Sequence, residues 1–131
     1  MELLRDLALK ENMLKELHEL EEWNNKHYLR PLDNLNDEWM KENAIIESDD
    51  LYALCIQVSN ELGGKCTYLL LKVISEYGVS YVALALAMYY MEIGEIELSI
   101  KAFHKCLKDE ETKTFGEIYL NAIDRILDNN N

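Results

Sequence analysis

Histidines, cysteines and paired acids are the side chains of this sequence that could do chemistry, but their spacing suits no metal site. His104 and Cys106 stand two residues apart in a predicted helix, so they point to different sides and cannot readily share an ion. Cys55 and Cys66 fall in separate predicted helices without a close-spaced partner. The helical di-iron pattern needs a glutamate three residues before a histidine, and it is absent at all three histidines, His18, His27 and His104. We therefore expect no metal and no cofactor.

Nucleophilic and acid–base patterns are also missing. No cysteine or serine lies in a glycine-rich elbow, and Gly63-Gly64 lacks the lysine-serine context of a phosphate loop. The acid pairs Glu21-Glu22 and Asp49-Asp50 fit a solvated helix face and a helix cap, and nothing in the sequence gives either pair a reason for a raised pKa. We predict that the protein is not an enzyme.

The chain is strongly acidic, with 25 acidic and 13 basic residues among 131 and a net charge of −12. This balance lacks the basic footprint of a nucleic-acid-binding protein and disfavours anionic membranes. The most apolar window, Tyr68 to Met91, contains Lys72 and Glu76, and its longest uncharged piece is too short to cross a bilayer. Three cysteines inside predicted helices, and charges throughout Met1 to Leu20, indicate reduced thiols and no signal peptide, as in a cytoplasmic protein.

Helix-forming composition, one proline and the apolar periodicity predict a single all-α domain, a stack or bundle of about seven helices built from antiparallel hairpins. Its predicted parts are an N-terminal helical segment (1–47), two helical hairpins (48–111), and a capping helix with a tail (112–131). Asn36 or Asp37 should cap a short helix, and Gly63-Gly64 should separate the two helices of the first hairpin.

The N-terminal segment is predicted to begin with one long helix from Glu2 to about His27. Two apolar stripes run along it, one through Leu3, Leu7, Leu14 and Leu17, the other through Leu9, Met13, Leu20 and Trp23. Both stripes pack inside the domain in the simpler interpretation. In the alternative, one stripe pairs two copies of the protein as a homodimer.

The densest apolar periodicity lies between Ser80 and Leu107, and Gly94 divides it into two helix-length halves. From Ser80 to Lys113 this stretch resembles a tetratricopeptide repeat (TPR), a helical hairpin of about 34 residues. The resemblance rests on small, large and aromatic positions: Leu86, Ala87, Tyr90, Gly94, Ser99, Phe103 and Cys106. It departs from the repeat at Ala83, where a large aromatic is usual, and at Glu111, where proline is common.

The resemblance implies a protein–protein interaction module, such as an adaptor, a chaperone-like binder or a subunit of a complex. By the same analogy, its groove would be lined by Tyr81, Leu84, Met88 and Met91. An aromatic ring and flexible methionines suit an apolar peptide or an amphipathic helix. The family's carboxylate clamp of lysine, arginine and asparagine has no counterpart at these positions. Alternatively, the chain's own N-terminal helix fills the groove and these residues belong to the core.

A second hypothesis comes from the charge. An acidic inhibitor would occupy the nucleic-acid site of a basic protein, with carboxylates in place of phosphates. Met1 to Glu47, with 12 acids and 6 bases, is the segment that this hypothesis singles out.

Overall fold

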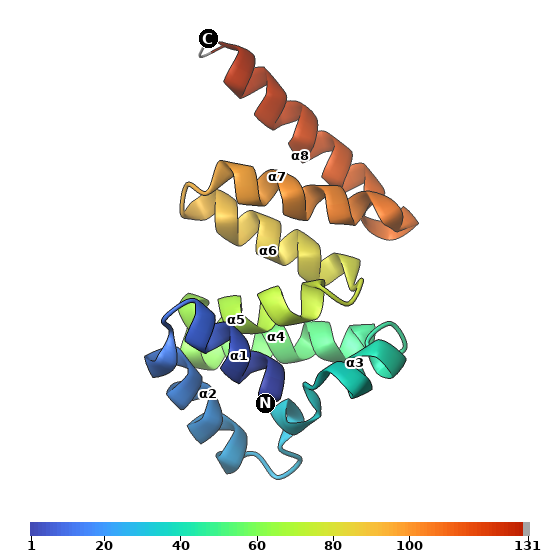
Figure 1. Ribbon diagram of the computed structural model, residues 1–131. Coiled ribbons are helices and arrows are strands. Elements are labelled where there is room, and N and C mark those ends of the chain that lie inside the picture. The colour runs from blue at the N-terminus through green and yellow to red at the C-terminus, as the bar shows by residue number, and fades with distance from the viewer. Residues whose placement is uncertain (130–131) are drawn as a thin grey trace. The chain divides into compact units, whose positions relative to one another are not determined.

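The computed structural model, described here for residues 1–129, confirms the all-α prediction. These residues form eight α-helices and two 3-10 helices, without a β-strand (Figure 1). They gather into two compact units, residues 1–79 and residues 80–129, which are described separately below. The division falls just after Gly78, whose φ of 87° lies in the left-handed region that glycine adopts without strain.

The first unit holds five α-helices and one 3-10 helix: α1 (Glu2–Lys10), α2 (Leu14–Lys26), η1 (Pro31–Asn34), α3 (Asp37–Asn43), α4 (Ser48–Leu62) and α5 (Gly64–Ser75). The hairpin of α4 and α5 was predicted, and it turns at Gly63, where φ is 90°. Helix α5 is almost wholly buried, and α1 and α2 both pack against it. The predicted cap of α3 is also present, because the Trp39 amide donates to Asn36 Oδ1 over 2.9 Å.

The prediction of one long N-terminal helix was wrong, because the chain breaks into α1 and α2 around Asn12. Asn12 has a φ of 56°, a left-handed conformation that asparagine tolerates better than most residues. The Met13 amide donates to the Ala8 carbonyl over 2.8 Å, and the Glu11 amide to the Leu7 carbonyl over 2.9 Å. The i→i−5 bond from Met13 with a left-handed residue just before it is the Schellman ending of a helix.

This break gives the structure one helix more than predicted, and it changes which side chains are buried. The buried positions of the two helices are Leu4, Ala8, Leu17, Leu20, Trp23 and Asn24. Two leucines of the predicted stripes, Leu9 and Leu14, are instead 65% and 51% exposed. A homodimer through this segment stays a prediction, but no continuous two-striped helix exists to support it.

The second unit consists of α6 (Ser80–Glu92), α7 (Ile96–Lys105), η2 (Cys106–Lys108) and α8 (Glu110–Asn129). Helices α6 and α7 form the predicted antiparallel hairpin, with Gly94 (φ 81°) in the turn (Figure 1). Helix α8 packs against η2, α7 and α6. The contact is close at Gly116, where an added Cβ would lie 3.1 Å from the Phe103 carbonyl oxygen. Phe103, fully buried, stacks on Tyr119 of α8 with ring centroids 5.0 Å apart.

Candidate protein-binding surfaces

The four side chains predicted to line a groove lie together on one face of α6. Tyr81 is 37% exposed, and Leu84, Met88 and Met91 are half-buried. Of the other large apolar residues of α6, three are buried and Tyr89 is half-buried; the buried ones are Val82, Leu86 and Tyr90. The helical spacing therefore grouped the four residues on the least buried face, and their contact with a partner stays a prediction. Helix α1, part of the N-terminal helix expected as the alternative occupant of this face, packs on α2 and α5 within the first unit.

A second surface, which sequence reasoning missed, is an apolar groove in the first unit. The segment between α2 and η1 forms one wall, and one side of α4 forms the other. The groove has a volume of about 420 Å³ and is lined by His27, Tyr28, Leu29, Pro31, Asp50, Ala53, Leu54 and Gln57. Tyr28 is 97% exposed and Leu29 82%, the highest values among the large apolar side chains of residues 1–129. Adjacent exposed apolar side chains beside a groove are typical of a surface that contacts another molecule.

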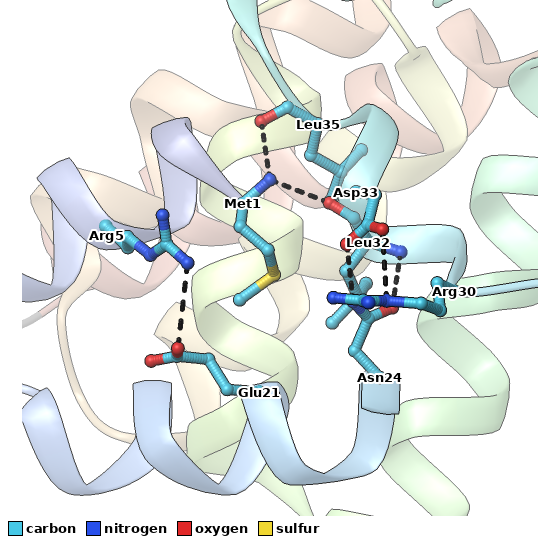
Figure 2. A network of polar contacts seen from close by, with 8 residues as sticks. All are labelled: Met1, Arg5, Glu21, Asn24, Arg30, Leu32, Asp33 and Leu35. Atoms are coloured by element: carbon cyan, nitrogen blue, oxygen red, sulfur yellow. Dashed lines mark hydrogen bonds and ion pairs between the residues drawn. The ribbon is translucent and has the colours of Figure 1, made fainter. Parts of the chain in front are cut away.

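Buried hydrogen bonds of Asn24 hold the segment between α2 and η1, one wall of the groove, in a defined conformation. Asn24, only 1% exposed, accepts from the Leu32 amide at Oδ1 over 2.9 Å and donates from Nδ2 to Asp33 Oδ1 over 2.7 Å (Figure 2). The Arg30 guanidinium pairs with the other Asp33 oxygen, 3.1 Å away. The α-amino group of Met1 donates to the Leu32 carbonyl over 2.8 Å (Figure 2). These bonds tie Leu32 and Asp33 back to α2, so Tyr28 and Leu29 are displayed from a loop that begins at α2 and is anchored to it again at its far end.

An acidic pocket adjoins the apolar groove. It has a volume of about 520 Å³ and is lined by Glu19, Glu22, Trp23, Lys26, His27, Glu61 and Leu62. Three carboxylates face one ammonium group there, so the pocket favours a cationic ligand group. The Trp23 indole N–H is buried and has no hydrogen-bond partner among the described residues.

His27 lines both the groove and the pocket, and contacts at both ring nitrogens hold its orientation. Nδ1 lies 2.7 Å from the Trp23 carbonyl oxygen, and Nε2 lies 3.4 Å from Gln57 Nε2. The carbonyl only accepts, so the ring donates the hydrogen bond at Nδ1. The ring also lies against Trp23, with centroids 3.9 Å apart. His27 is therefore held in place as the ridge between an apolar and an acidic subsite.

The cysteines offer little nucleophilic chemistry in the native state. Burial raises the pKa of Cys55 to about 12 and that of Cys106 to about 11. Burial, followed by hydrogen bonding to Glu19, raises the pKa of Cys66 to about 12. At neutral pH all three stay thiols, and the thiolate is the reactive form. Within residues 1–129, no cluster of three or more histidine, cysteine or acidic side chains is arranged to hold a metal ion.

No protein-family model matches the chain, and no curated protein or solved structure is significantly similar to it. The TPR resemblance of residues 80–113 therefore stays a prediction. Across the described part of the chain, no helix combines the length and apolar character needed to cross a membrane.

Proposed function

We propose that this protein is a protein-interaction module that docks a short segment, a peptide or a helix, carrying an apolar side chain next to a basic one. The observation that carries the proposal is that the apolar groove and the acidic pocket meet at His27. An adaptor or a complex subunit needs only such a docking surface. The three buried free thiols support a cytoplasmic location.

The apolar subsite would supply most of the affinity. Tyr28 and Leu29 cost free energy while they face water, at about 25 cal/mol for each Å² of apolar surface. A leucine or aromatic side chain seated beside Leu54 and Ala53 would cover them and the groove together. Because hydrogen bonds of Asn24 already fix the loop, little conformational entropy is lost when the ligand binds.

The acidic subsite would select the neighbouring residue. Glu19, Glu22 and Glu61 favour lysine or arginine there, and the first unit as a whole carries 16 acidic and 8 basic residues. This field attracts cationic segments and repels acidic ones. An exposed charge pair of this kind contributes more to specificity and association rate than to affinity.

Selection from a phage-displayed library of random peptides, followed by binding titrations with the winning peptide, tests the proposal. We expect enrichment of apolar residues adjacent to lysine or arginine. Leu29→Asp should lower the affinity for the selected peptide at least about tenfold. Leu9→Asp is the matched control, since Leu9 is also exposed but lies on α1, outside the groove lining.

A second pair of variants tests the acidic subsite. Glu22→Lys should lower the affinity for the selected peptide and make that affinity less dependent on salt. Glu38→Lys on α3 is the control, because it makes the same charge change away from the pocket. Equal effects of Glu22→Lys and Glu38→Lys would show that only the net charge matters. Failure to enrich any motif, or full binding by Leu29→Asp, would contradict the proposed function.

Two alternatives remain, docking on the α6 face and mimicry of nucleic acid. Binding of the same peptide and the effect of salt on the complex distinguish them. If the α6 face is the docking site, Leu84→Asp with Met88→Asp should abolish binding while Leu29→Asp leaves it intact. If the protein instead mimics nucleic acid, its complex with a basic target should dissociate steeply as salt rises, and neither apolar substitution should matter.

A further inference from the structure

Helix α8 leaves one long face uncovered. Thr112, Gly116 and Ile123 are its buried residues, and residues 124–129 are all exposed. On the side of α8 turned from these residues, Phe115 is 51% exposed and Ile118 is 57% exposed. In Figure 1 α8 diverges from α7 toward its C-terminal end. Phe115 and Ile118 are three residues apart, so they present adjacent apolar side chains to solvent on this face.

The uncovered face has a spacing that reads the same in both directions along the helix. Six exposed residues follow intervals of 4, 3, 4, 3 and 4, and we call them the α8 seam: Glu111, Phe115, Ile118, Ala122, Arg125 and Asn129. Intervals of three and four are the heptad pattern of a coiled-coil contact. A seam with this symmetry can meet an inverted copy of itself around a twofold axis that crosses the seam midway between Ile118 and Ala122, which is the geometry of an isologous interface.

We propose that the α8 seam pairs antiparallel with the α8 seam of a second copy of this chain. In this register Ile118 lies opposite Ala122 of the other copy, so a large side chain meets a small one at both central layers. Phe115 lies opposite Arg125, an aromatic face against a guanidinium group. Arg125 is also within one helical turn of Glu111 of the other copy. Within the described residues Arg125 makes no ion pair, so it is free for this contact.

The remaining charges do not oppose this pairing locally. Beside the seam, Asn121 meets Asn121 across the axis, and Thr114 lies near Asp128. The other charged residues of α8 lie further from the seam, at Glu110, Lys113, Glu117 and Asp124. The chain's net charge of −12 still repels a second copy over distance, and salt screens that repulsion. The seam is one helix wide, below the standard interface of about 1,600 Å², so we expect a dissociation constant on the order of micromolar or weaker.

Sedimentation equilibrium of the full chain at rising concentration and physiological salt tests the pairing. The mass should rise from 15.3 kDa toward twice that value. Ile118→Glu should abolish the rise, and Lys113→Gln should not, although both substitutions change the net charge by the same amount. Both sites are exposed, and circular dichroism confirms that each variant keeps its helix content.

Charge exchange tests the register. Arg125→Glu alone and Glu111→Arg alone should each weaken the dimer, because each creates like-charge pairs across the axis. An equimolar mixture of the two variants should restore it, because every cross pair is then opposite in sign. Asn121→Cys should cross-link two copies under mild oxidation, whereas Asp124→Cys, which faces away, should not.

A monomer at every concentration would overturn the proposal. So would a dimer that survives Ile118→Glu, which would assign pairing to another surface such as the N-terminal segment. Failure of the mixed variants to associate, with the wild type dimeric, would overturn the antiparallel register.

Discussion

Replacing Asn24 by alanine tests whether one buried amide holds the wall of the apolar groove. The substitution removes the acceptor of the buried Leu32 amide, and an orphaned buried donor costs about 1–3 kcal/mol. It also removes the bond to Asp33, a partly exposed carboxylate, worth about 1 kcal/mol. Alanine regains about 0.5 kcal/mol through its higher helix propensity. We therefore expect the free energy of unfolding of the first unit to fall by about 1.5–3.5 kcal/mol.

Urea denaturation followed by tryptophan fluorescence measures this loss, because Trp23 and Trp39 both belong to the first unit. Asn25→Ala is the matched control, since Asn25 is exposed one residue further along α2. The peptide selected in the binding assay should also bind Asn24→Ala more weakly, because residues 27–32 lose their anchor. A loss below about 0.5 kcal/mol, with unchanged peptide binding, would refute the role given to this amide.

Asn24→Asp separates the two bonds. A carboxylate keeps an acceptor for the Leu32 amide but lies against Asp33 Oδ1, where the native nitrogen is 2.7 Å away. Repulsion between the two carboxylates should raise the pKa of the new acid in the folded state. The free energy of unfolding of Asn24→Asp should therefore fall further below that of the wild type as pH rises through that pKa. The difference between the two proteins should shrink as pH falls. A deficit that does not change with pH would contradict this geometry.

Four further predictions concern the packing and the titrating groups. Phe103→Ala should cost about 3–5 kcal/mol by circular dichroism, because the ring is fully buried; a negligible change would mean that α7 is misassigned. Gly116→Ala should cost about 1–3 kcal/mol despite its better helix propensity, because backbone and Cβ atoms surround the added methyl group. A hydrogen bond from Tyr77, and then Lys41, lowers the pKa of Asp37 below its ordinary 3.8, so its stabilisation is lost as pH falls through that lowered value. Asp37→Asn should flatten this acid-side fall in Tm, and an unchanged profile would exclude the contact. A thiol reagent at neutral pH should modify no cysteine in the native protein and all three in urea.

Local signals in the sequence predicted most helix ends. Gly63 and Gly94 adopt positive φ angles at the predicted turns, and Asn36 caps α3 as expected. The break at Asn12 was not predicted, because an asparagine inside an amphipathic pattern is also compatible with a continuous helix. Its left-handed φ ends α1, and the periodicity on either side continues with almost no interruption. Pattern alone could not distinguish one helix of two stripes from two helices that each bury one face.

The α6 face could be grouped from helical spacing, but the groove at His27 could not. Its walls come from residues 27–31 and from α4, which are about twenty residues apart in sequence and share no periodicity. The exposed neighbours Tyr28 and Leu29 next to Pro31 were a faint signal, since two large apolar residues in a loop have no helix to bury them.

The amino-acid sequence by itself determined the helical class, the positions of the glycine turns and the acidic surface, because these follow from local propensity, backbone strain and composition. Only the tertiary structure decided which apolar side chains are buried, where the chain divides into two units, and how Asn24 anchors a loop beside α4. Those outcomes depend on contacts between residues far apart in the chain. Burial that depends on such long-range contacts has no regular spacing in the sequence from which it could be predicted.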